Sequence, residues 1–182
     1  AFAAAPTVML AALVAGFVDA GLFTQITVYE LGAGFDRKIA TGSLSIFMAG
    51  NLVLQLPLGW LADHSSRRGI LLLSAFIVVA GAALYPFLLG AGLWLWVMMF
   101  VWGGVSWGIY TLALGLMGER FPAAELAAAN AAFVMMYEVG SFFGPVVAGG
   151  AMVLSPVYGL SIVVAAVAGA LFFFGLIRNH GR

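Results

Sequence analysis

Six long apolar runs separated by short polar segments make up nearly the whole sequence. Each run approaches or exceeds the roughly 20 apolar residues that an α-helix needs to cross a bilayer. None shows the alternation of apolar and polar positions that is typical of a transmembrane β-strand. The pattern therefore predicts an all-α integral membrane protein, with residues 1–182 forming a single domain of six transmembrane helices. The predicted helices span Thr7–Leu31, Ile39–Ala62, Gly69–Leu89, Leu93–Gly118, Ala123–Ala151 and Val157–Ile177.

Composition supports this class and excludes several functions. Hydrophobic residues make up 64% of the chain and charged residues only 8%, whereas soluble domains carry about 25% charged residues. Most of the surface must therefore face lipid. The net charge of zero gives no reason to expect a nucleic-acid partner. Cysteine is absent and the two histidines lie in polar segments near helix ends, so we expect neither a metal site nor a cofactor.

The basic residues are distributed unevenly over the predicted loops. With six helices, both termini and the loops after the second and fourth helices lie on one side of the membrane. Five of the seven basic residues fall on that side, which predicts that both termini are cytoplasmic and that the chain is a multi-pass protein of the plasma or inner membrane. The five are Arg67, Arg68, Arg120, Arg178 and Arg182, and the other two are Arg37 and Lys38.

The loop after the second predicted helix contains the most specific motif of the chain. Residues 59–71 read GWLADHSSRRGIL and closely resemble the signature G-x-L-A-D-R-x-G-R-R-x-x-L of the major facilitator superfamily. In that superfamily the signature joins the second and third helices of each six-helix half. His64 and Ser66 depart from it, where the signature has a basic residue and a glycine. The matching residues are Gly59, Leu61, Ala62, Asp63, Arg67, Arg68 and Leu71.

A second resemblance lies in the fifth predicted helix. Residues 140–149, GSFFGPVVAG, are similar to the g-x-x-x-G-P-x-x-G-G element of the drug:proton antiporters of the superfamily, with Ala148 in place of one glycine. The fourth predicted helix lacks the arginine that N-terminal halves usually carry. The resemblance therefore implies helices 7–12 of a twelve-helix transporter, with a missing N-terminal six-helix half as partner. The start of the chain, which lacks an initiator methionine, agrees with this expectation.

Both motifs suggest physical roles. Gly140 and Gly144 lie on one stripe of their helix, where small residues let two helices approach closely in lipid, and Pro145 should bend that helix. Gly59 should permit a similar approach at the end of the second helix. Asp63 can face the positive N-terminus of a helix in the missing half, and we expect it to act in conformational change. Arg67 and Arg68 can pair with acids.

Two acidic residues lie at the middle of predicted helices, where an ionised carboxylate costs about 2.5–3.5 kcal/mol on insertion scales. They are Asp19 and Glu138, and both should lie at a similar membrane depth. Burial favours the neutral form of a carboxyl, which suits proton uptake and release. The alternative is a hydrogen-bonded structural carboxyl. Glu30 lies eleven residues after Asp19 on almost the same helical face, but close to the helix end, where solvent can reach it.

The resemblance implies a secondary transporter of small organic molecules that works by alternating access, and the embedded carboxyls favour proton coupling. We expect efflux of small amphipathic molecules. The cavity of such a transporter is lined by the first and fourth helices of each half. Alternatives are a homodimeric channel or scaffold of six helices and a membrane enzyme acting on lipid, although no cluster of catalytic residues indicates an enzyme. Candidate cavity residues are Asp19, Phe23, Trp107 and Tyr110, and weaker polar candidates are Gln25, Asn51, Gln55, Asn130 and Tyr137.

Overall fold

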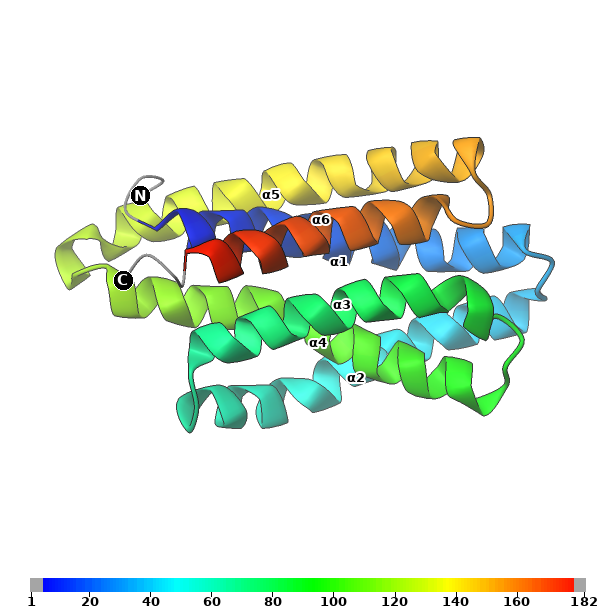
Figure 1. Ribbon diagram of the computed structural model, residues 1–182, viewed down its shortest axis with the longest axis horizontal. Helices are drawn as coiled ribbons and strands as arrows, with labels where there is room; N and C mark the ends of the chain where they lie inside the picture. Colours follow the sequence, from blue (N-terminus) through cyan, green and yellow to red (C-terminus); the bar gives the residue numbers. More distant parts are fainter. Residues whose placement is uncertain (1–4, 179–182) are drawn as a thin grey trace.

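The computed structural model describes residues 5–178 and contains six α-helices in that range, each long and apolar enough to cross a membrane (Figure 1). The all-α fold with six spanning helices is thereby confirmed. The helices are α1 (Pro6–Gly32), α2 (Arg37–Asp63), α3 (Arg67–Leu88), α4 (Leu93–Arg120), α5 (Ala123–Leu154) and α6 (Gly159–Ile177).

Local capping explains why two helices begin earlier than their apolar runs. The side chain of Asp36 accepts hydrogen bonds from the backbone N–H groups of Lys38 (2.6 Å) and Ile39 (3.0 Å), so α2 begins at Arg37. The hydroxyl oxygen of Ser66 accepts from the N–H of Gly69 at 3.2 Å, which caps α3. These side chains satisfy backbone donors that the first turn of a helix leaves free. As a result, α2 and α3 each begin with charged residues that precede the apolar run.

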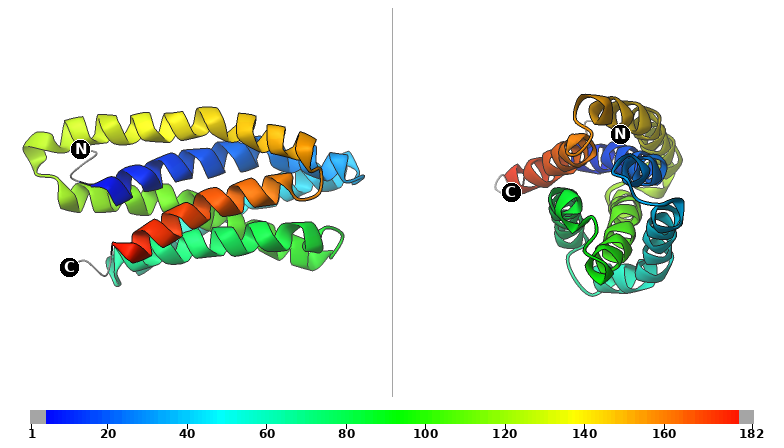
Figure 2. Two further views of the ribbon diagram at one scale, coloured as in Figure 1. Left: turned by 45° about the horizontal axis from the view of Figure 1, so that its top comes forward. Right: turned by 90° about the vertical axis from the view of Figure 1, so that its right-hand side faces the viewer.

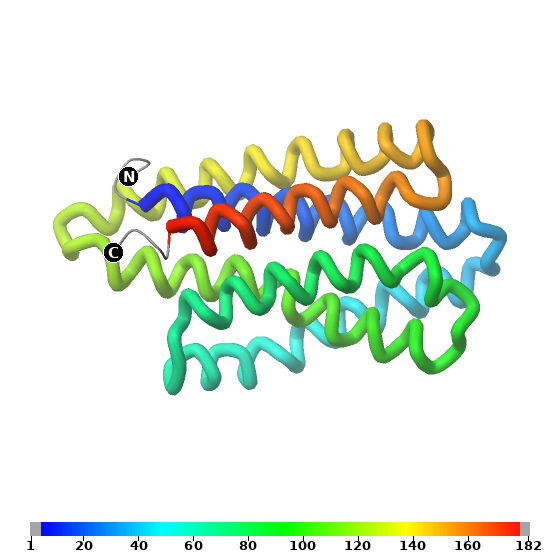
Figure 3. Tube along the Cα trace, in the orientation of Figure 1, coloured from blue at the N-terminus to red at the C-terminus, as the bar shows by residue number. Residues whose placement is uncertain are grey.

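Both described ends of the chain lie at one end of the bundle, together with the α2–α3 and α4–α5 loops (Figure 1). We call this the terminal end, and the opposite end, with the other three loops, the distal end. The most extensive packing joins α1 to α5 and α2 to α4, while α3 packs on α6 (Figures 2 and 3). Exchanging α1–α3 with α4–α6 preserves these pairs, which is the pattern of an inverted repeat.

The contact between α1 and α5 is a crossing of two glycines. A Cβ atom added to Gly16 would collide with the backbone carbonyl of Tyr137, three residues before Gly140. A Cβ atom added to Gly140 would collide with the backbone carbonyl of Leu13, three residues before Gly16. Each helix thus places its glycine against the backbone of the other, and the two backbones are in direct contact. This confirms close packing at the stripe that the sequence indicated, and α5 continues through Pro145 without interruption.

The contact between α2 and α4 repeats this geometry. A Cβ atom on Gly50 would strike the carbonyl of Phe100, three residues before Gly103, and one on Gly103 would strike the carbonyl of Phe47, three residues before Gly50. The same reciprocal pair therefore occurs once in each of the two equivalent helix contacts.

Replacing Gly140 by alanine should destabilise the fold, because the added methyl group has no room against the α1 backbone. Overpacking of this kind costs about 1–3 kcal/mol. Gly150 on the same helix is the matched control, since it is exposed and a Cβ there meets nothing within 4 Å. Unfolding of the full-length protein in detergent should show a lower midpoint for Gly140→Ala and no loss for Gly150→Ala. Equal midpoints would contradict the crossing.

Candidate functional site

Asp19 is the middle residue of α1 and is only 2% exposed. The phenol of Tyr137 on α5 interacts with its carboxyl, yet neither carboxyl oxygen has a hydrogen-bond partner of good geometry among the described residues. A buried ionised carboxylate without a paired cation is costly. The fold therefore holds at its centre a titratable group whose charge it does not compensate.

Two tyrosines connect Asp19 to the fourth helix. The ring of Tyr137 packs edge-on against Tyr110 of α4, with 5.0 Å between the ring centroids. Tyr110 also contacts Phe133 of α5 at 5.3 Å. The hydroxyl of Ser141, one turn after Tyr137, interacts with the Tyr137 phenol. Asp19, Tyr137 and Tyr110 thus form one cluster across α1, α5 and α4, which we call the central cluster.

An open groove of about 670 Å³ lies between α2 and α4, next to the central cluster. A chain of hydrogen bonds crosses it: the hydroxyl of Thr111 donates to Gln55 Oε1 at 2.9 Å, and Gln55 Nε2 donates to Asn51 Oδ1 at 3.1 Å. Tyr110 belongs to both the groove and the central cluster. The lining residues carry no charge, and they are Ser45, Met48, Ala49, Asn51, Leu52, Gln55, Trp107, Tyr110 and Thr111.

Four further sequence candidates lie elsewhere. Gln25 donates a hydrogen bond to the carbonyl of Pro145 at 3.2 Å and so joins α1 to α5 outside the groove. Glu138 lies at the middle of α5 and is exposed, as is Asn130 nearer the terminal end. Phe23 is 47% exposed on α1 and is not among the groove residues.

Two polar residues of this region were missed by sequence reasoning. Thr111 follows the candidate Trp107 by four positions, and Ser141 follows Tyr137 by four positions, so the helical spacing could have indicated both. The expectation that solvent reaches Glu30 was wrong: its side chain is fully buried and accepts a hydrogen bond from the phenol of Tyr85. Within residues 5–178, no group of three or more acidic or histidine side chains could hold a metal ion.

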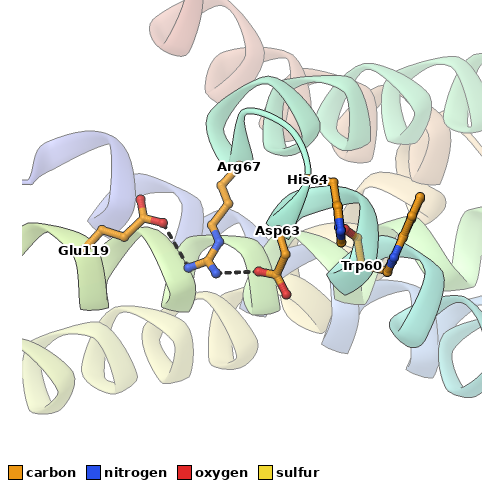
Figure 4. Close-up of polar contacts among 5 residues, drawn as sticks. All are labelled: Trp60, Asp63, His64, Arg67 and Glu119. Atoms are coloured by element: carbon orange, nitrogen blue, oxygen red, sulfur yellow. Dashed lines mark hydrogen bonds and ion pairs between the residues drawn. The ribbon is translucent and has the colours of Figure 1, made fainter.

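The loop motif forms an ionic network at the terminal end (Figure 4). One guanidinium nitrogen of Arg67 contacts Asp63 at 2.6 Å and the other contacts Glu119 of α4 at 3.0 Å. Asp63 was expected to face a helix of a missing half. In this structure it pairs with Arg67, although its side chain remains 60% exposed. His64, which departs from the signature, stacks on Trp60 with 4.6 Å between the ring centroids.

Two other motif residues differ from expectation. Arg68 binds no acid in the described contacts but donates to the backbone carbonyl of Gly175 at 2.5 Å, which ties the start of α3 to the end of α6. A cation near a helix C-terminus is favourable because the last carbonyls lack partners. A Cβ at Gly59 would meet nothing within 4 Å, so the close approach expected there does not occur among the described residues.

The described residues form six apolar helices in two inverted units, with a buried carboxyl that lacks an ionic partner close to a largely apolar groove, and this arrangement is that of a multi-pass membrane protein. The sequence profile of the Major Facilitator Superfamily matches residues 1–145. This match covers more than half of the chain, so the chain belongs to this superfamily.

Similar proteins agree with this assignment. The uncharacterized MFS-type transporter YfkF of Bacillus subtilis (strain 168) is 28% identical over 139 residues, which cover 74% of this chain and 34% of the relative. The uncharacterized MFS-type transporter YcaD of Salmonella paratyphi B is 25% identical over 177 residues, covering 93% and 43%. The chain thus spans less than half the length of these curated relatives.

One solved structure has the same fold. The crystal structure of the POT family transporter PepTSo superposes with a TM-score of 0.82, covering 96% of this chain and 37% of that one. The sequence identity of 17% makes this a likeness of fold alone.

Arg67 and Arg68 are adjacent but should contribute differently to stability. Arg67→Ala removes ion pairs of a partly exposed side chain, each of which contributes about 0–1 kcal/mol. Arg68→Ala removes a charged hydrogen bond to a helix end, an interaction that contributes about 1.5–3 kcal/mol. Chemical unfolding of the full-length protein in detergent should rank Arg68→Ala as the more destabilised variant. The reverse order would mean that the Arg67 network, and not the tie to α6, holds this end together.

Proposed function

We propose that this chain is the C-terminal six-helix half of a proton-coupled secondary transporter that exports small amphipathic organic molecules by alternating access. The observation that carries the proposal is the continuity between Asp19 and the groove. Asp19 contacts Tyr137, Tyr137 packs on Tyr110, and Tyr110 lines the groove that contains Gln55. Protonation at one end of this path and substrate contact at the other can therefore influence each other.

The environment of Asp19 supports proton coupling. Burial favours the neutral form of its carboxyl, because among residues 5–178 no cation and no well-formed hydrogen bond compensates a charge. Ionisation requires water to reach the carboxyl. A rocking motion of two halves brings water to a site near the midplane from alternate sides, so each opening can load or release one proton.

The chemistry of the groove supports the class of substrate. Its hydrogen-bonding groups, the amides of Asn51 and Gln55 and the hydroxyl of Thr111, are neutral, while Trp107 and Tyr110 offer aromatic surface. Such a wall suits molecules that combine polar groups with an apolar body. The direction of transport, efflux, is the one implied by the similarity of residues 140–149 to drug:proton antiporters.

Exposed surface on α2 and α5 supports a second six-helix half as partner. Leu52, Leu56, Phe142 and Val146 are each more than 60% exposed and lie on the two helices that are least covered within this chain. Gly59 leaves open space on the same helix as Leu52. Because the relatives are more than twice as long as their matched segments, these faces are the natural contact with the remainder of a full-length transporter.

Membrane topology offers a first test. The distribution of arginine and lysine favours a cytoplasmic terminal end in the plasma or inner membrane. Single cysteines can be introduced at Ser65 in the α2–α3 loop and at Ala91 in the α3–α4 loop, since this chain contains no cysteine. A membrane-impermeant thiol reagent should label Ala91→Cys in intact cells and Ser65→Cys only after lysis. The opposite result would reverse the proposed orientation.

Asp19→Asn tests the proton coupling. Asparagine keeps a polar side chain of the same size but cannot titrate, so the variant should fold and lose transport driven by a proton gradient, while substrate exchange without a gradient persists. Transport in vesicles with an imposed pH gradient is the measurement. Glu125→Gln is the control, because Glu125 lies exposed in the first turn of α5, far along the helix from the central cluster. Normal uphill transport by Asp19→Asn over the whole pH range would show that Asp19 is structural.

A further inference from the structure

The distal end of the bundle contains a second buried carboxyl that the function proposed above does not use. Glu30 lies in the last turns of α1 and its side chain is 0% exposed. The phenol of Tyr85 on α3 donates a hydrogen bond to Glu30 Oε1 at 3.0 Å. The hydroxyl of Ser43 on α2, itself fully buried, is within reach of the same carboxyl. Glu30 thus joins the distal ends of three helices.

No cation among the described residues compensates a charge on Glu30. Tyr29 packs on the Tyr85 ring at 4.9 Å, but its phenol donates to the carbonyl of Val157 and is not available to the carboxyl. The charged side chains at this end, on residues 36–38, are exposed at the start of α2. An ionised Glu30 would therefore be a buried charge without an ionic partner in the described part of the chain, which is unfavourable by several kcal/mol per ion.

Two oxygen atoms of this cluster lack hydrogen-bond partners of good geometry: Glu30 Oε2 and Ser43 Oγ. A proton on Oε2 would turn that oxygen into a donor, with Ser43 Oγ as its acceptor. The hydroxyl of Ser43 can then donate onward to the backbone of its own helix, as serines in helices do. The bond to Ser43 can form in either protonation state, and only the added proton also removes the buried charge.

We infer that Glu30, Tyr85 and Ser43 form a second proton-binding site, separate from Asp19, whose occupation closes the distal ends of α1, α2 and α3 against each other. The proton binds to Glu30 Oε2 to give the carboxylic acid and leaves to water. The ionised carboxylate needs hydration, so loss of the proton opens the contact between these helices. Eleven residues separate Glu30 from Asp19, about 16 Å along the helix, so the two sites are filled from different depths.

Infrared spectroscopy of the full-length protein in lipid tests the binding of the proton. The carbonyl stretch of a protonated carboxylic acid should be present at neutral pH and should be lost in Glu30→Gln, while Asp19→Asn retains this component. Tyr85→Phe should move the band to higher frequency, because the bond to Oε1 is lost, and Tyr29→Phe should not move it. If no band component disappears in Glu30→Gln or shifts in Tyr85→Phe, the carboxyl is ionised and the inference is wrong.

Cysteine accessibility tests the closure. Ala40 is fully buried on α2, one turn before Ser43, and Thr41 beside it is exposed. The measured quantity is the labelling rate of Ala40→Cys divided by that of Thr41→Cys, which corrects for thiol ionisation. This ratio should rise with pH, by about tenfold per pH unit below the midpoint of the Glu30 titration. Adding Glu30→Gln should abolish this rise.

A pH-dependent ratio that survives Glu30→Gln would overturn the closure. If Glu30→Gln does not fold, the same ratio is measured in Tyr85→Phe. Loss of the Tyr85 phenol should change the pH profile of the ratio, whereas Tyr29→Phe should leave that profile unchanged. The Asp19→Asn background separates the two proposals. A failure of proton coupling at Asp19 leaves both readouts of Glu30 intact.

Discussion

Backbone contact at glycines is the constraint on which the arrangement of this bundle depends. Lipid is as apolar as leucine, so burying apolar side chains does not by itself bring membrane helices together, and close packing must supply the attraction. Gly16 and Gly140 bring α1 against α5, and Gly50 and Gly103 bring α2 against α4. The first crossing also builds the site. Asp19 lies one turn after Gly16, and the Tyr137 backbone is the surface that Gly16 touches, so the carboxyl and the phenol meet.

The two kinds of contact in the structure suit different tasks. The glycine crossings join the helices within the chain backbone to backbone, and interfaces packed this closely behave as rigid units. The network of Asp63, Arg67 and Glu119 is partly exposed, and such ion pairs contribute little free energy. A network of this strength can exchange partners during a rigid-body motion of the whole six-helix unit, whereas the crossings cannot. Movement of this kind is therefore expected at the exposed faces of α2 and α5, and inside the bundle only at the distal ends of α1, α2 and α3, away from the glycine crossings.

The fold can be predicted from the sequence alone, but which face of each helix is buried cannot. Length and hydropathy located all six helices, and the loop motif and the embedded Asp19 pointed to the superfamily and to the centre of the bundle. In lipid, however, both the buried and the exposed faces of a helix are apolar, so no amphipathic stripe distinguishes them. For this reason Glu30 was expected near solvent, although it is fully buried, and the pattern did not show that Glu138 is exposed. The open space at Gly59 and the tie of Arg68 to α6 depend on how helices cross, which no local pattern encodes.

The inverted repeat provides an argument about the two buried acids. Gly16 of α1 and Gly103 of α4 are equivalent in the inverted repeat and lie 87 positions apart. With this offset, Asp19 corresponds to Ser106 and Glu30 corresponds to Met117. Ser106 and Met117 are both buried as well. The packing of this fold thus accepts a small hydroxyl or a thioether at the equivalent places, and it does not require a carboxyl at either. The two buried carboxyls of α1 therefore fit the changes of protonation proposed above better than a requirement of packing.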